Sequence, residues 1–255
     1  MSSAFPNVWV MQGGWVRFVV SHDPRIAREL LLRPPSVVLG PLGPVDGRPD
    51  HRTVTAWAWP SYHRFSKYIT GFPGFYRGVD TALYDPESWD ATPAREQRHV
   101  IEAMTAFAAL GHERGWQVIV TPHPSLTQVA NAECPARPDE SANEAFVRCD
   151  VMGAAARVAD VVESQAQSLE RDPGAYRAFV QTTAAQARVA NPDVQVIAGL
   201  SVRAATSPDQ LYAAWNAVRD LVDGYYLSIQ DNDHVPVALA FLRMVDLARN
   251  APSSD

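Results

Sequence analysis

Short apolar runs rich in β-branched residues alternate with longer runs of helical spacing along most of this 255-residue chain. Proline, glycine or aspartate follows several of the short runs, which is typical of strand ends. We predict strands at residues 36–40, 53–59, 78–84, 116–121, 161–162, 194–200 and 225–229. Because strands separated by helices usually pair in parallel, this alternation predicts a parallel sheet covered by helices.

The runs between the predicted strands carry signals of helix starts. Thr92 is expected to cap a helix at residues 93–114, and Asp172 a helix at residues 173–190, each just ahead of a proline. Further helices are predicted at residues 142–158, from Ser207 onward, and at 235–249. These helices fall between the strands, as a repeated strand–helix unit requires.

An eighth strand can come from residues 8–20, which two glycines divide. The set fits a closed (β/α)8 barrel or an open doubly wound sheet. The sequence lacks the glycine-rich fingerprint of a dinucleotide-binding sheet, and polar residues end many strands. A length near 250 residues also favours the barrel. We therefore predict one domain, residues 1–255, folded as an α/β (β/α)8 TIM-type barrel with an irregular segment at residues 1–35.

The charge and hydrophobicity of the chain argue against nucleic-acid and membrane partners. The chain has 22 Lys and Arg against 28 Asp and Glu, a formal net charge of −6, which argues against nucleic-acid binding. No apolar run reaches the ~18 residues of a membrane span. The first residues lack the basic and apolar regions of a signal peptide. We expect a small-molecule ligand, no nucleic-acid or membrane partner, and a cytoplasmic location.

The two cysteines, Cys134 and Cys149, lie 15 residues apart. This spacing can close a disulfide, but two cysteines alone make no disulfide framework. We expect both to be reduced. No histidine is close to Cys134 in the sequence, which argues against a cysteine nucleophile.

In a barrel, the carboxyl ends of all strands meet at one mouth, however far apart they lie in the sequence. Many of the predicted strands end in polar or aromatic residues. By strand alternation, the side chains expected at the mouth are Trp57, Trp59, Asp85, Glu87, Thr121, His123, Glu163, Gln165, Gln167, Ser201, Arg203, Tyr226, Ser228 and Gln230. We predict that they line a substrate pocket.

Glu163, Gln165 and Gln167 follow a short apolar run and, at a spacing of two, share one strand face. Burial would raise the pKa of Glu163 and keep a proton available, as a general acid requires. The glutamines would orient substrate hydroxyls or hold the carboxylate. A purely structural hydrogen-bonded network is the alternative.

Asp85 and Glu87 follow the strand at 78–84 and are candidates for a second catalytic carboxylate. The alternative is an Asx-Pro turn in which they cap loop amides. His123 lies between two prolines and would be a proton shuttle, a ligand or a hydrogen-bonded loop residue. Asp85, Glu87, His123 and Glu163 have the chemistry to hold a divalent ion. No closely spaced ligand motif supports this, and we expect neither a metal nor a cofactor.

Trp57, Trp59 and Tyr226 offer aromatic faces at the same level of the predicted barrel. Indole faces beside hydrogen-bonding groups suit a sugar ring, which is apolar on its faces and polar at its rim. They equally suit a cationic or prenyl-like intermediate. Ordinary packing of the core and helices is the alternative.

A set of short motifs is spread over residues 79–229. They are Tyr84-Asp-Pro-Glu87, Trp89, Thr92-Pro93, Glu96-Gln97, Gln165-Ala-Gln167, Asn191-Pro192, Ala198-Gly-Leu200 and Asp223-Gly-Tyr-Tyr-Leu227. In these motifs the chain resembles a group of actinobacterial proteins that look like glycoside-hydrolase-like TIM barrels. The resemblance implies a barrel with sugar-cleaving chemistry. Where such enzymes place a catalytic carboxylate after the last motif, this chain has Ser228 and Gln230.

Three functions are consistent with these features. The first is carboxylate acid/base catalysis on a glycosidic or polyhydroxylated substrate, with Glu163 as general acid and Asp85 or Glu87 as the second carboxylate. The second is a cofactor-independent lyase, isomerase or cyclase of small-molecule biosynthesis, such as that of secondary metabolites or terpenoid-like compounds. The third is a non-catalytic ligand-binding barrel. A barrel fold alone does not choose among them.

Overall fold

The computed structural model describes residues 8–32, 35–40, 54–72, 79–203 and 206–251. Its strands form a closed barrel in the order β1 to β8. Neighbours pair in parallel, for example β4 with β5 and β5 with β6. The strands are β1 Val8–Gln12, β2 Val37–Leu39, β3 Val54–Trp59, β4 Thr81–Tyr84, β5 Gln117–Val120, β6 Val161–Ser164, β7 Gln195–Val202 and β8 Gly224–Ile229. The predicted (β/α)8 barrel is confirmed.

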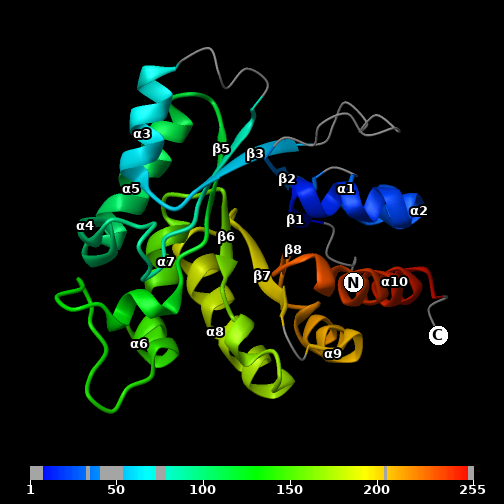
Figure 1. Cartoon of the computed structure of the whole chain (residues 1–255). Helices are drawn as coiled ribbons and strands as arrows, with labels where there is room; N and C mark the ends of the chain where they lie inside the picture. The colour runs from blue at the N-terminus through cyan, green and yellow to red at the C-terminus, as the bar shows by residue number, and fades with distance from the viewer. Residues whose placement is uncertain (1–7, 33–34, 41–53, 73–78, 204–205, 252–255) are drawn as a thin grey trace. The chain divides into compact units, whose positions relative to one another are not determined.

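Helices follow the strands along the chain (Figure 1). The α-helices are α1 Gly13–His22, α2 Pro24–Ile26, α3 Tyr62–Gly71, α4 Ala94–Arg98, α5 Val100–His112, α6 Ala142–Arg148, α7 Val151–Ala156, α8 Pro173–Ala190, α9 Pro208–Val218 and α10 Val235–Asn250. The π-helix η1 is Ala27–Leu31, and the 3-10 helices are η2 Pro124–Gln128, η3 Gln167–Leu169 and η4 Asn232–His234.

The described residues group into two compact units. The first takes in residues from 1–54, 166–178 and 198–255, and the second takes in 55–165 and 179–197. In the first unit, the Trp9 ring of β1 lies 5.3 Å from Tyr225 of β8 and 6.3 Å from Phe241 of α10. These buried aromatic side chains tie the β1–β8 pair to the helix that covers it.

The second unit has an aromatic core of its own. Helices α3 and α5 lie side by side (Figure 1), and the rings of Phe65 and Phe107 stack at 4.0 Å between them. The Tyr84 ring of β4 stacks on Phe107 at 4.9 Å. Tyr84 therefore points from the sheet toward the helices, which fixes the orientation of the residues beside it.

Residues 8–32 are the described part of the segment that was predicted to be irregular. Strand β1 is followed at once by α1, and α2 and η1 continue the helical path to Leu31. The glycines that divide this stretch, Gly13 and Gly14, mark the junction of strand and helix. The first βα unit thus has a strand and a helix, followed by a short helix and a π-helix.

Two predicted helices are each broken into two. The one at 93–114 breaks at His99, whose backbone (φ −121°, ψ 54°) is not helical. The one at 142–158 breaks at Asp150, which adopts a left-handed conformation with φ 50°. The predicted cap Asp172 is confirmed, because its Oδ1 accepts hydrogen bonds from the first backbone amides of α8.

The expectation of reduced cysteines is wrong. Cys134 and Cys149 form a disulfide, with Cα atoms 6.0 Å apart. Such a bridge persists in oxidising compartments and is rare in the cytosol. The bridge therefore does not favour the predicted cytoplasmic location. Among the described residues, no helix is both long and apolar enough to cross a bilayer.

Candidate active site

The candidate site begins with the direction of side chains on β4 and β6. Tyr84 of β4 and Ser164 of β6 point to the helices: Tyr84 donates a hydrogen bond to Glu96 of α4, and Ser164 is bonded to Thr183 of α8 at 2.8 Å. Successive side chains on a strand point to opposite faces. Asp85 and Glu163, the neighbours of these two residues, therefore face the inside of the barrel.

The register of the three strands places the inward residues in one row. Val120 of β5 pairs with Tyr84 on one side and with Val162 on the other. The Thr121 amide donates to the Tyr84 carbonyl at 2.9 Å, so the ladder continues by one residue. Asp85, Thr121 and Glu163 then lie side by side. Two strand steps of roughly 4.8 Å separate the backbones of Asp85 and Glu163 by about 10 Å.

Asp85 is held through one of its two carboxyl oxygens. Its Oδ1 accepts a hydrogen bond from the Thr121 hydroxyl at 2.7 Å and another from the Gln165 amide at 3.0 Å. The same Gln165 nitrogen donates to the Thr121 carbonyl at 2.5 Å. In the described part of the chain, no residue donates to Oδ2. Oδ1 is therefore fixed by two hydrogen bonds, whereas Oδ2 is available to bind a ligand.

The surroundings of Asp85 favour its protonated form. Burial raises the pKa of Asp85, and the hydrogen bonds from Thr121 and Gln165 lower it by less. Both donors are neutral, so no positive charge among them stabilises the carboxylate. Asp85 thus keeps its proton to a higher pH than an ordinary aspartate does, which suits a proton donor.

Glu163 is 2% exposed, so its carboxyl group is withheld from bulk water. Its place on the inner face of β6 agrees with the predicted direction of the residue. Gln165 is also where it was predicted, and of the two roles considered for it, the one that the structure shows is holding a carboxylate. The carboxylate that it holds is that of Asp85.

His123 and Glu87 have structural contacts in the loops beyond β5 and β4. The His123 Nδ1 accepts from the Ser125 amide at 3.1 Å, so His123 caps η2. The Glu87 amide donates to the Thr92 hydroxyl at 3.3 Å within a turn. Thr92 does not cap α4 as predicted, because its hydroxyl donates to the Pro60 carbonyl. The role of the Glu87 carboxylate stays a prediction.

The carboxylate and histidine groups do not assemble a metal site. Asp85, Glu87, His123 and Glu163 are all described, and no three His, Cys, Asp or Glu side chains among the described residues form a group that could hold an ion. The set considered from the sequence is therefore not brought together as metal ligands.

The prediction that Trp59 forms a wall of the mouth is wrong. Its ring packs on the helix side of β3, 5.7 Å from Phe65 and 5.6 Å from Tyr68 of α3. Trp57 lies two residues earlier and so shares this outward face. The sequence shows that the two residues share a face, but it does not show which face that is.

The remaining predicted site residues belong to the first unit. The Tyr225 hydroxyl donates to the Trp215 carbonyl on the helix side, so Tyr226 and Ser228 lie on the inner face of β8. Gln230 is exposed just beyond this strand. The inward direction predicted for β8 therefore holds for Tyr226 and Ser228.

The register of β7 and β8 places Ser201 beside Ser228 and Arg203 beside Gln230, because the Gln230 amide donates to the Val202 carbonyl at 3.1 Å. This agrees with the direction predicted for both residues. The Ser201 hydroxyl is bonded to Glu170 in the connection between β6 and α8, and Arg203, two residues on, shares its face. Arg203 and Gln167 line a cavity of about 260 Å³ together with Glu170. This cavity lies within the first unit.

Glu170 is a buried acid that the sequence analysis missed. It accepts hydrogen bonds from the Ser201 amide at 2.5 Å and from the Ser201 hydroxyl at 3.2 Å. Burial raises the pKa of Glu170 to about 8, against smaller lowering by Ser201 and the Arg203 charge. Its position in a charged loop, Glu170-Arg-Asp172, gives no sign of burial, so only the contact with Ser201 reveals it.

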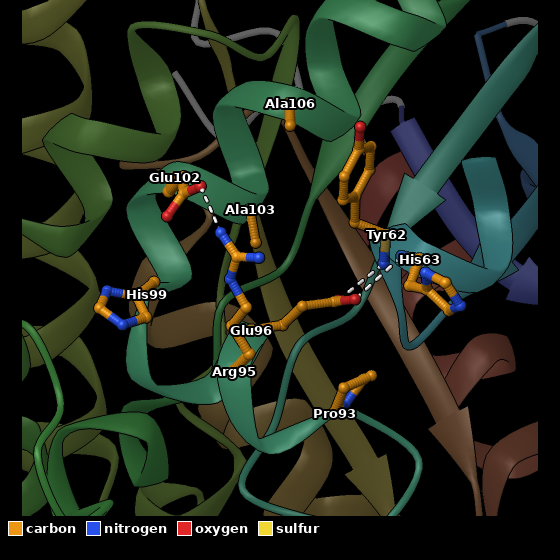
Figure 2. Close-up of a pocket in the computed structure, with 9 residues that line it drawn as sticks. All are labelled: Tyr62, His63, Pro93, Arg95, Glu96, His99, Glu102, Ala103 and Ala106. Carbon is orange, nitrogen blue, oxygen red and sulfur yellow. Dashed lines mark hydrogen bonds and ion pairs between the residues drawn. The ribbon is translucent and has the colours of Figure 1, made fainter.

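A second acid, Glu96, borders a cavity of about 300 Å³ in the second unit (Figure 2). Its carboxylate accepts from the Ser61 hydroxyl at 3.0 Å, from the Tyr62 and His63 amides at 2.7 and 2.9 Å, and from the Tyr84 hydroxyl at 2.9 Å. Both oxygens are thus occupied at the start of α3. Glu96 is a helix cap rather than a free acid.

Comparison with known proteins supports the fold. No protein-family model and no curated protein matches the sequence. Triosephosphate isomerase from Bartonella henselae matches this chain with a TM-score of 0.50 and 9% sequence identity. The match covers 96% of this chain and 100% of that one. A candidate alpha-L-fucosidase from Bacteroides thetaiotaomicron has a TM-score of 0.50 at 12% identity, over 72% of this chain and 60% of that one. This chain therefore spans less than two thirds of the second protein. At such identities the likeness concerns the barrel fold, which many chemistries share.

Proposed function

We propose that this chain is an enzyme that acts on a polyhydroxylated small molecule by acid/base catalysis at the carboxyl ends of β4, β5 and β6. Asp85 would be the proton donor and Glu163 the second carboxylate. The observation that carries the proposal is the carboxyl group of Asp85, which is anchored at Oδ1, open at Oδ2 and shifted toward its protonated form.

The roles follow from the surroundings of the two acids. Asp85 holds a proton that Oδ2 can present to a leaving oxygen, while Thr121 and Gln165 fix the group in one orientation. Glu163, in the same row, would stabilise positive charge or activate water. The sequence analysis predicted Glu163 as the proton donor. We assign this role to Asp85 instead, because burial raises the pKa of Asp85.

The groups around Asp85 favour a substrate with many hydroxyls. Thr121 and Gln165 are neutral and hydrogen-bonding, and they carry no charge that would select an ionic group. A sugar-like molecule needs such partners at its rim. Glycoside cleavage by paired carboxyls works at separations of about 5–5.5 Å with retention and about 6.5–9.5 Å with inversion.

A cofactor-independent isomerase or lyase is the second candidate. One observation favours it: a single anchored acid of raised pKa is sufficient to move a proton, without a second carboxyl at a fixed separation. The products distinguish the two. Cleavage of an aryl glycoside supports the hydrolase, whereas rearrangement of an unmodified sugar at constant mass supports the isomerase.

The test is turnover of a panel of nitrophenyl glycosides and free sugars, followed by absorbance and by nuclear magnetic resonance. Asp85→Asn is expected to lower kcat about 10²–10⁴-fold. Asp90→Asn, an exposed aspartate of the same connection, is the matched control and should leave kcat unchanged. A panel that gives no turnover would favour the non-catalytic barrel. Turnover that Asp85→Asn does not reduce would remove Asp85 from the mechanism.

A further inference from the structure

The cavity of about 260 Å³ in the first unit has walls from two successive strand–helix connections. Residues 167–171 after β6 supply one wall, Arg203 and Thr206 after β7 supply another, and the first turn of α9 closes it with Gln210 and Leu211. Polar side chains make up almost the whole lining. Such a lining suits a ligand group that accepts several hydrogen bonds.

Two arginines in this lining, Arg171 and Arg203, form no ion pair in the described part of the chain. Elsewhere, arginines such as Arg177 and Arg243 are paired with aspartates. Two unpaired guanidinium groups around one cavity raise its affinity for an anion.

Glu170 is the one acid among the described residues of the lining, and its charged form is disfavoured by burial. Its pKa is raised to about 8, mainly by burial, so the group is largely protonated at pH 7. Its oxygens are also engaged by the amide and hydroxyl of Ser201. The two guanidinium groups therefore face an acid whose charged form is disfavoured by burial.

Neutral donors complete the lining. The Gln210 side-chain oxygen accepts from the Ser207 amide at 3.0 Å, which leaves the Gln210 amide hydrogens for a ligand. Ser168 is exposed and lines the same cavity. Guanidinium forks and amide donors match the oxygens of a phosphate, and two positive charges match its charge of about −1.5 to −2 better than that of a single carboxylate.

We propose that this cavity binds the phosphate group of a small molecule, with Arg171 and Arg203 as the charged ligands and Gln210 as a neutral one. The site lies in the first unit and does not rest on the acid/base role proposed for Asp85. A failure of one proposal therefore leaves the other untouched.

Isothermal titration of the full chain with inorganic phosphate at pH 7 tests the proposal. Arg171→Gln and Arg203→Gln are each expected to weaken phosphate binding at least tenfold. The control is Arg28→Gln, which removes the same charge from an exposed position in the same unit, and a change below twofold is expected there. Acetate should bind at least tenfold more weakly than phosphate.

The results that overturn the proposal are equally defined. Absence of binding at millimolar concentrations of phosphate, or equal losses in all three arginine variants, would exclude a specific site in this cavity. Acetate binding as tight as that of phosphate would exclude the phosphate assignment. Retained circular dichroism in each variant separates loss of a ligand from loss of the fold.

A second measurement uses the ionisation of Glu170. Arg171 and Arg203 are the other charged groups among the described residues of the lining. Sulfate is the probe, because its charge is constant from pH 6 to 9. Its affinity should fall several-fold as the pH rises through about 8, and Glu170→Gln should abolish that fall. A fall of the same size in Glu170→Gln would contradict the arrangement.

Discussion

Two acids of the second unit, Glu96 and Asp85, differ in how many hydrogen bonds their carboxyl oxygens accept. Glu96 accepts four hydrogen bonds, spread over both oxygens, and borders a well-formed cavity (Figure 2). Asp85 accepts two, both on Oδ1. The difference teaches that an acid beside a cavity can be fully occupied by the fold, whereas Asp85 keeps one oxygen without a donor among the described residues.

The donors explain why the two acids behave differently. Two of the four donors to Glu96 are backbone amides at the start of α3, where the helix dipole also favours a negative charge. Asp85 has only the neutral side chains of Thr121 and Gln165, and burial raises its pKa. The two acids therefore differ in the kind and number of their hydrogen-bond donors.

The largest effect is expected for removal of Glu96. Glu96→Ala leaves four donors without their acceptor and should lower the free energy of unfolding by about 3–5 kcal/mol. Urea unfolding measures this. Glu102→Ala is the control: it lines the same cavity and pairs with Arg95 at 3.2 Å, but both side chains are exposed, so it should change stability by less than about 1 kcal/mol. An equal loss of unfolding free energy in the two variants would contradict the structural role given to Glu96.

A third acid, Glu170, is expected to make the free energy of unfolding depend on pH. Its pKa is about 8 in the folded chain and 4.5 ordinarily, so the folded state holds an extra proton between these values. The stability that this proton provides is complete below pH 4.5 and is lost as the pH rises to about 8. Relative to Glu170→Gln, the wild type should lose up to about 1.4 kcal/mol per pH unit in this window. Urea unfolding at pH 5, 6, 7 and 8 would show parallel curves if Glu170 titrated normally.

A smaller effect is expected for a single donor of the Glu96 cluster. Burial, with the neighbouring Glu96 charge and hydrogen bond, raises the pKa of Tyr84 far above its ordinary value, so the phenol remains a donor. Tyr84→Phe should cost about 0.5–1.5 kcal/mol in thermal or urea unfolding. Tyr62→Phe changes the same group at the rim of the cavity and should cost less. The reverse order would mean that Glu96 does not need the Tyr84 hydroxyl.

The smallest effect on stability is expected for Asp85→Asn. Asparagine keeps an oxygen for Thr121 and Gln165 and has no charge to desolvate. Burial raises the pKa of Asp85, so the folded state is favoured while the group is protonated. The stability of the variant relative to the wild type should therefore increase as the pH rises. Urea midpoints at pH 6 and 8 measure this. A variant that is clearly less stable at pH 8 would mean that Asp85, like Glu96, serves the fold.

The inward direction of Asp85, Glu163 and Gln165 was predictable, because a period of two needs only the sequence and a barrel brings strand ends together. The error on Trp59 arose from the same rule. Alternation assigns residues to two faces, and the packing of Trp59 on α3 decides which face is outside.

By itself, the sequence determined the order of strands and helices and hence the parallel barrel, because hydrophobic period, prolines and caps are local signals. Only the tertiary structure decided which acids accept hydrogen bonds on both carboxyl oxygens and which on one. Glu96 and Asp85 lie 11 residues apart and Glu170 meets Ser201 across 31 residues. Hydrogen-bond partners and desolvation depend on neighbours brought together by folding, and no local pattern specifies them.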